Sequence, residues 1–210
     1  NLPVTKIKNE FGRMDKNIAK AYLGKFYLYQ KKYGEALALF KDVMAGKNVE
    51  DMPFWNNFDV TKENGPEAIM VSKHAINKDG NGENGNVGDM LAGVNNNSVT
   101  GCCGFFQPTI DLVNAYKVGT DGLPLSTTAY RANPYLSDLK NPTSTYVLDQ
   151  TLAFHPRLDY TVGRRGVQYL DYGIMPGNSW VREPSSAGPF IGIKSIVQKS
   201  LLGIETTPGD

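Results

Sequence analysis

Hydrophobic positions follow a helical period near the start of the chain. Between residues 15 and 30, large apolar side chains recur every three or four residues, which is the spacing of one helix face and not the alternation of a strand. They are Ile18, Tyr22, Phe26 and Tyr29. The pattern breaks over residues 31–34 and resumes over residues 35–45, where Gly46 follows at a position that commonly ends a helix. The sequence therefore predicts two antiparallel helices.

Several residues of this hairpin, which spans residues 13–46, fall at the offsets of a tetratricopeptide repeat. They are Leu23, Gly24, Tyr27, Ala36 and Phe40. Gly24 and Ala36 are small enough to let two helices approach closely, whereas the first signature position holds Lys20 in place of a large apolar residue. The sequence contains no second copy, and one repeat cannot bury its outer faces alone. We therefore expect neighbouring helices from outside this chain.

Beyond the hairpin, the periodic segments are short. Residues 68–71 form an apolar run that predicts a strand. Residues 109–117 have the period of a helix, with Thr109 or Asp111 near its cap. Residues 77–88 resemble a calcium-binding loop, but the twelfth position, which needs a glutamate, holds Gly88. We expect a flexible loop there.

Together these patterns predict a mostly α-helical protein. A tetratricopeptide-like hairpin within residues 1–50 would support an irregular, loop-rich lobe with short strands over residues 51–210. The contents of Gly (22) and Pro (12) among 210 residues agree with abundant loops.

Composition narrows the function classes. Lys plus Arg (22) balance Asp plus Glu (21), so the overall charge favours neither nucleic acid nor an anionic membrane surface and suits a neutral or small ligand better. The sequence has no apolar run long enough for a membrane span and no signal-peptide pattern at its start. The cysteines, Cys102 and Cys103, are neighbours, which excludes a disulfide framework and a four-cysteine zinc site. A vicinal disulfide and two free thiols both remain open.

Catalytic chemistry finds little support in the sequence. The histidines, His74 and His155, lie in no nucleophile, zinc or phosphate-binding motif. A glycoside hydrolase needs two carboxylates across a cleft, and such a pair can be drawn from Asp111, Asp121, Asp159, Asp171 and Glu183. We expect most of these to act instead as helix caps, turn residues or partners of arginines. Those arginines are Arg157, Arg164, Arg165 and Arg182. The sequence thus predicts no enzyme, no catalytic residues, no metal and no cofactor.

Aromatic residues in loops offer a different chemistry. The apolar faces of sugar rings stack on aromatic side chains, while Asn, Asp, Gln and Arg satisfy the sugar hydroxyls. Two parts of the sequence combine these residue types, namely Phe105-Phe106-Gln107, and residues 169–172 together with Trp180. The alternative interpretation is that these rings fill a core made of loops.

Several short motifs follow one another in a specific order. They are Gly12-Arg13, residues 21–29, Tyr33-Gly34-Glu35-Ala36, Asn57-Phe58-Asp59, residues 66–70, residues 101–109, residues 111–116, Gly122-Leu123-Pro124 and residues 156–164. In this order the chain resembles the SusD/RagB family of Bacteroidota outer-membrane lipoproteins. Pro156-Arg157-Leu158-Asp159-Tyr160-Thr161 is similar to the D-P-R-L-D-W-T motif of that family, with His155 in place of the acidic residue and Tyr160 in place of the tryptophan.

The resemblance implies a SusD-like fold, in which residues 1–210 form part of a single domain and the N- and C-terminal parts of the full protein lie outside this chain. It also implies a lipid-anchored protein on the extracellular face of the outer membrane. Such a protein binds a glycan or another nutrient for a SusC-like TonB-dependent transporter, with no nucleic-acid partner and no bond-making step.

In this interpretation the candidate ligand-binding residues belong to the loop-rich lobe. They are Phe105, Arg164, Tyr169, Asp171, Tyr172 and Trp180. Two other functions remain open: a peptide-binding member of the same family, and a tetratricopeptide-type protein-interaction module that binds no sugar.

Overall fold

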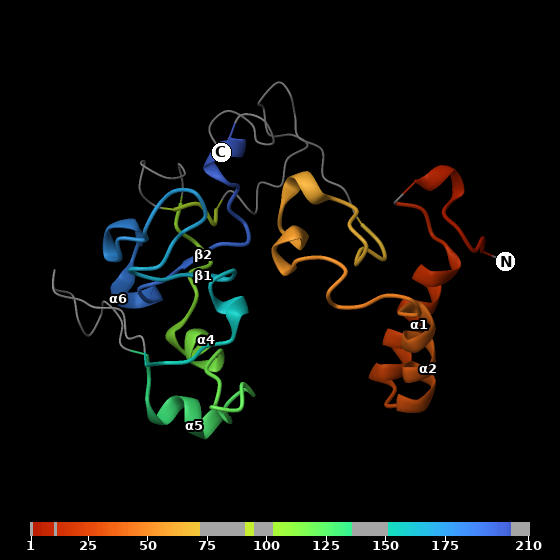
Figure 1. Cartoon of the computed structure of the whole chain (residues 1–210), viewed down its shortest axis with the longest axis horizontal. Helices are drawn as coiled ribbons and strands as arrows, with labels where there is room; N and C mark the ends of the chain where they lie inside the picture. Colours follow the sequence, from red (N-terminus) through yellow and green to blue (C-terminus); the bar gives the residue numbers. More distant parts are fainter. Residues whose placement is uncertain (1, 11, 72–90, 95–102, 136–150, 203–210) are drawn as a thin grey trace. The chain divides into compact units, whose positions relative to one another are not determined.

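The structure is a computed structural model that describes residues 2–10, 12–71, 91–94, 103–135 and 151–202. The chain divides into two compact units, Asn1–His74 and Ala75–Asp210. Within the described part, helices predominate and strands are few and short (Figure 1), as the sequence predicts. The calcium-like segment 77–88 and His74 lie outside the described residues, so these two predictions concern parts of the chain that are not described.

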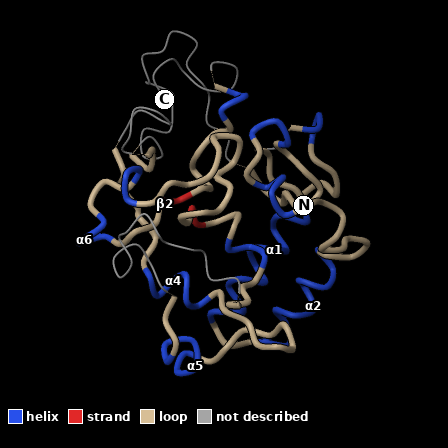
Figure 2. The backbone as a smooth tube through the Cα atoms, turned by 60° about the vertical axis from the view of Figure 1, so that its left-hand side comes forward, coloured by secondary structure: helices blue, strands red, loops and turns tan. Residues whose placement is uncertain are grey.

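The first unit is built on α1 (Lys16–Tyr29) and α2 (Tyr33–Val43), which lie side by side (Figures 1 and 2). The helix α1 begins where a cap is available, because the buried carboxylate of Asp15 accepts a hydrogen bond from the backbone N–H of Ile18 at 2.8 Å. Lys31 turns the chain between the helices with a φ of 60°. Both predicted helices are confirmed, and α2 starts at Tyr33, slightly earlier than predicted.

Small residues bring the two helices together. A Cβ atom added to Gly24 would lie 2.8 Å from Cε1 of Phe40, and Ala36 is buried at the same seam. Lys20, the exception to the repeat pattern, forms an ion pair with Asp42 of the opposite helix. Its charge therefore links the two helices at a position where an apolar side chain is usual.

The rest of the first unit consists of loops and short 3₁₀ helices. These are η1 (Ile7–Asn9), η2 (Phe54–Asn57) and η3 (Val60–Lys62). Around η2, the ring centroids of Phe54 and Trp55 lie 5.4 Å and 5.9 Å from that of Phe58, which makes a small aromatic cluster.

The predicted strand at residues 68–71 is wrong. These residues adopt no strand conformation, and the backbone N–H of Ala68 donates to the carbonyl of Gly65 at 2.9 Å in a turn. An apolar run becomes a strand only where a second strand supplies backbone partners. Among the described residues, no second strand pairs with this segment.

The second unit surrounds a two-stranded antiparallel sheet. Val162 of β1 (Val162–Gly163) pairs with Gly192 of β2 (Ile191–Gly192), and Gly163 pairs with Ile191. Figure 2 shows the strands in red among long loops. The helices described in this unit are α4 (Ile110–Ala115), α5 (Thr127–Ala132), α6 (Pro184–Ala187), η4 (Pro156–Leu158), η5 (Asn178–Trp180) and η6 (Lys199–Leu201). Its core contains Val113, Tyr135, Leu158, Val162 and Phe190.

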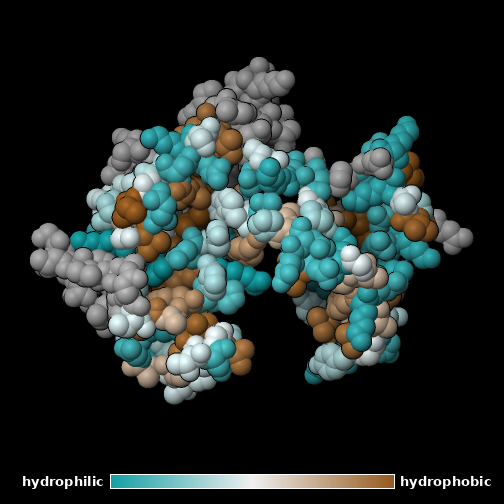
Figure 3. Space-filling view, in the orientation of Figure 1, coloured by the Kyte–Doolittle hydropathy of each residue, from teal (hydrophilic) through white to brown (hydrophobic). Residues whose placement is uncertain are grey.

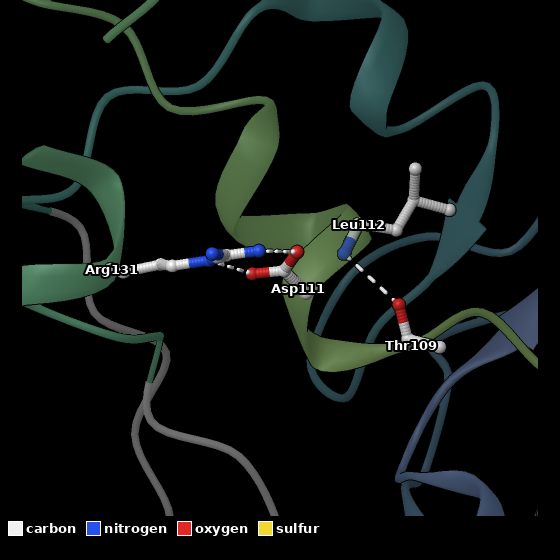
Figure 4. A network of polar contacts seen from close by, with 4 residues as sticks. All are labelled: Thr109, Asp111, Leu112 and Arg131. Carbon is white, nitrogen blue, oxygen red and sulfur yellow. Dashed lines mark hydrogen bonds and ion pairs between the residues drawn. The ribbon is translucent and has the colours of Figure 1, made fainter. Parts of the chain in front are cut away.

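The helix α4 confirms the prediction for residues 109–117. Oγ1 of Thr109 accepts a hydrogen bond from the backbone N–H of Leu112 at 3.1 Å and so caps the helix (Figure 4). In the same view, Nε and Nη2 of Arg131 donate to the carboxylate oxygens of Asp111 at 2.8 Å and 2.7 Å, which ties α5 to α4. These hydrogen bonds lower the pKa of Asp111.

The segment that follows His155 also has a structural role. Nδ1 of His155 accepts a hydrogen bond from the backbone N–H of Arg157 at 3.2 Å and caps η4, a task that a carboxylate also performs. The guanidinium of Arg164 pairs with Asp159, and its Cζ lies 5.1 Å from the ring centroid of Phe154. His155 therefore supplies the cap of η4, and Asp159 supplies the carboxylate partner of Arg164.

Candidate ligand-binding site

Most of the predicted ligand-binding residues contact the protein itself. Tyr169 is 0% exposed, and its hydroxyl donates to the carbonyl of Gly192 at 2.7 Å. Burial, and secondarily the charge of Tyr172, raise the pKa of the Tyr169 hydroxyl. The ring of Trp180 packs edge-on against that of Tyr169, with 5.7 Å between the ring centroids. The hydroxyl of Tyr172 donates a hydrogen bond to the carbonyl of Val197 at 2.9 Å.

Asp171 and Arg164 also contact other residues of the protein. The carboxylate of Asp171 accepts hydrogen bonds from the backbone N–H groups of Lys199 at 2.6 Å and Ser200 at 2.8 Å, at the start of η6. The side chain of Arg164 is buried between aromatic rings beside Asp159. The burial of Tyr169 and its contact with Trp180 match the alternative interpretation, in which the rings fill a core made of loops. Ligand contact by these residues stays a prediction.

Phe105 has different surroundings. It is 47% exposed, and the neighbouring Phe106 is 70% exposed. Gly104 and Phe106 both have positive φ angles, of 71° and 58°. A positive φ costs a glycine little but strains a bulky aromatic residue, and such strain occurs preferentially at functional sites.

The loop that carries these rings is tied to the protein on several sides. The backbone N–H groups of Gly104 and Phe105 donate to the carbonyls of Gly93 at 2.7 Å and Leu91 at 2.8 Å. Nε2 of Gln107 donates to the carbonyl of Phe190 at 3.4 Å. The loop is thus held at its start and at its end, while the two rings between project toward solvent.

Cys103, at the start of this loop, is disulfide-bonded. The second cysteine of the sequence, Cys102, lies outside the described residues. Of the two alternatives that the sequence leaves open, the structure supports the disulfide for Cys103. A covalent bond at this position adds a further restraint to the loop.

Arg182 completes the arrangement, and sequence analysis missed its role. Its Cζ lies 4.4 Å from the centroid of the Phe105 ring, and its Nη1 donates to the carbonyl of Cys103 at 2.7 Å. The sequence predicts Arg182 only as a carboxylate partner, because 76 residues separate it from Phe105 and no local pattern connects them. We call Phe105, Phe106 and Arg182 the aromatic platform.

The carboxylates considered for catalysis have structural partners. Asp111 pairs with Arg131, Asp159 pairs with Arg164, and Asp171 caps η6. Oδ1 of Asp121 accepts a hydrogen bond from the backbone N–H of Leu123 at 3.0 Å in a turn. Within the described ranges, no group of three or more His, Cys, Asp or Glu residues is arranged to hold a metal ion.

Comparisons with known proteins leave the family open. No family model matches the chain, and no curated protein matches it. In the described part of the structure, no helix is both long enough and apolar enough to cross a membrane. The functional argument therefore rests on the geometry of the aromatic platform and on the sequence motifs.

Proposed function

We propose that this chain belongs to a SusD/RagB-type nutrient-binding lipoprotein, which captures a saccharide and delivers it to a TonB-dependent transporter at the outer membrane. The step is binding and release, with no bond made or broken. The observation that carries the proposal is the aromatic platform: Phe105 and Phe106 are exposed on a loop that backbone hydrogen bonds hold in place.

Saccharide binding explains why an exposed pair of rings would be held so firmly. Burial of an aromatic side chain removes a large apolar area from water and stabilises the fold, and a ring that stays exposed does not provide this stabilisation. A ring fixed before the ligand arrives loses little conformational freedom on binding, so more of the stacking energy appears as affinity. Phe106 also retains its strained φ of 58°, which packing with the core does not require because the side chain is 70% exposed.

The helical hairpin supports the family proposal in a different way. The close approach of Gly24 to Phe40 and the burial of Ala36 are what a tetratricopeptide-type seam needs. The motif from Pro156 to Thr161 forms a capped turn beside the β1 strand, followed by the Asp159–Arg164 pair. A motif with such a structural role is consistent with a shared scaffold, onto which each protein of the proposed family adds its own ligand contacts.

A Phe106→Gly variant of the full-length protein tests the platform. Glycine relieves the positive φ, so we expect the free energy of unfolding to stay within about 1 kcal/mol of the parent value. Loss of the ring should weaken binding about tenfold in calorimetric titration against a panel of neutral and acidic oligosaccharides. A Phe26→Ala variant removes a ring of similar exposure from α1 and serves as the matched control. Equal affinities for the parent and the Phe106→Gly variant would contradict the platform assignment.

A protein-interaction module is the second candidate, because the hairpin also exposes apolar side chains. On α1 and α2 these are Tyr22, Leu23, Phe26, Leu28, Tyr29, Tyr33 and Leu37. Over the hairpin, Figure 3 shows scattered hydrophobic side chains, in brown and tan, among hydrophilic ones in teal. If this candidate is the correct one, Phe26→Ala should reduce co-purification of the transporter partner, while no oligosaccharide of the panel binds the parent protein.

A further inference from the structure

Within the part of the chain that the structure describes, the guanidinium of Arg182 makes one hydrogen bond and keeps further donors. An arginine side chain carries five N–H donors in a planar fork. Arg182 uses Nη1 for the carbonyl of Cys103 at 2.7 Å. Other cations of the described residues, among them Arg13, Lys20, Arg131 and Arg164, form salt bridges with carboxylates. The side chain of Arg182 is exposed, so its remaining donors are open to a ligand.

The position of this guanidinium is fixed before any ligand binds. Its Cζ lies 4.4 Å from the ring centroid of Phe105, within the range of a cation–π contact, and the bond to Cys103 restrains it from a second direction. The nearest acidic residue in the sequence is Glu183, whose carboxylate accepts a hydrogen bond from Oγ of Ser185. The protein thus holds a charged fork in place next to two exposed rings and gives it no carboxylate from the described residues.

We propose that the aromatic platform selects acidic saccharides and that Arg182 is the residue that determines this specificity. The inference rests on the proposed saccharide-binding function. A sugar ring stacks on Phe106 and on the exposed surface of Phe105, while the carboxylate or sulfate of the sugar accepts hydrogen bonds from Arg182. Bidentate pairing with an oxyanion is the interaction for which an arginine fork is best suited.

An acidic saccharide differs from the neutral ligand that the composition of the chain favours. The near balance of charges over the whole chain favours a neutral ligand, but recognition depends on the charges within reach of the ligand. A single positioned guanidinium provides specificity for an anion without altering the net charge of +1.

Matched ligand pairs test the proposal on the full-length protein. The first pair is tetragalacturonate and its methyl ester, and the second is a sulfated galactan oligosaccharide and its desulfated form. We expect the parent protein to bind at least one acidic member about tenfold more tightly than its neutral counterpart. The pair that shows the preference identifies the anion as carboxylate or sulfate.

Variants of Arg182 assign the preference to this residue. Arg182→Gln should abolish the preference, and Arg182→Lys, which keeps the charge but lacks the fork, should retain only part of it. Arg13→Gln removes the same charge from an exposed arginine of the first unit and should leave the preference unchanged. Near-UV circular dichroism and the urea midpoint check that each variant is folded.

The outcomes separate this inference from the proposed function. If the parent protein binds neutral and acidic members of both pairs equally, or if Arg182→Gln keeps the preference, the role of Arg182 is overturned while saccharide binding stands. If the parent protein binds no saccharide of the neutral and acidic panel, the proposed function fails and the specificity proposal fails with it.

Discussion

Gly163 occupies the most tightly packed position of the small sheet, and an alanine there should destabilise the second unit. A Cβ atom at this position would lie 2.7 Å from Cγ1 of Ile191 and 2.7 Å from Cδ2 of Tyr169. Both neighbours are held: Ile191 pairs with Gly163 across the sheet, and the hydroxyl of Tyr169 donates to the carbonyl of Gly192. The added methyl group must therefore displace side chains that have little freedom to move.

The expected size of the effect follows from three contributions. Overpacking a core costs about 1–3 kcal/mol. Displacing the Tyr169 ring would also weaken the bond between its hydroxyl and Gly192, which is worth about 1 kcal/mol. Alanine restricts the unfolded chain and returns about 0.4–1 kcal/mol. We expect Gly163→Ala to lower the free energy of unfolding by about 2 kcal/mol.

Urea denaturation followed by tryptophan fluorescence measures this change. The ring centroid of Trp180 lies 5.7 Å from that of Tyr169, so the fluorescence of Trp180 reports on unfolding of the second unit. A Trp55→Phe background removes the signal of the other tryptophan. Gly192→Ala is the matched control, because a Cβ at Gly192 has no atom within 4 Å. This control should leave stability unchanged or raise it by up to about 1 kcal/mol, because alanine restricts the unfolded chain without crowding the sheet. Equal urea midpoints for Gly163→Ala and Gly192→Ala would refute the packing argument.

Three other substitutions test individual contacts. Asp15→Ala removes the cap at the backbone N–H of Ile18 and should cost about 1 kcal/mol of stability, measured by the thermal unfolding of the first unit. Tyr169→Phe should lower the free energy of unfolding by about 1 kcal/mol at pH 7. Because folding raises the pKa of the Tyr169 hydroxyl, the parent protein should lose stability as the pH rises above about 10, and the variant should lose less stability over the same range. Partial burial opposes the ionisation of Asp171, but hydrogen bonds from backbone N–H groups outweigh this effect and lower the pKa of the carboxyl group. The carboxylate therefore stabilises the fold above about pH 4, and this contribution is lost as the pH falls through the pKa of the folded state. Asp171→Asn should therefore flatten the acid side of the stability profile measured by urea titration, whereas an unchanged profile would show that the cap of η6 contributes nothing.

Local patterns predicted α1, α2 and α4, but not α5 or α6, because the causes of the three predicted helices are local. The period of apolar residues, the cap at Asp15 and the cap at Thr109 all lie within one or two turns of the element they define. The close approach of the two helices at Gly24 was also predictable, since Gly24 and Ala36 are small residues of one hairpin and leave room for it.

The rest of the fold depends on contacts that no local pattern encodes. The apolar run at residues 68–71 looks like a strand but has no strand partner, whereas β1 and β2 are too short to show a period of their own. Tyr169 and Phe105 are equally plausible ligand platforms in the sequence. They differ because the second unit packs around one ring and leaves the other in solvent.

Among the described residues, the aromatic platform and the exposed apolar side chains of the hairpin belong to different units, which makes their functions separable. The aromatic platform depends on contacts from residues 91–93, 103–107 and 182–190, all within the second unit. The hairpin surface depends on the seam between α1 and α2 in the first unit. Phe106→Gly should therefore alter saccharide affinity and leave transporter co-purification intact, and Phe26→Ala should do the reverse if the hairpin contacts the transporter. A protein in which both variants lose both activities would require a coupling between the units, and neither surface could then be assigned a function alone.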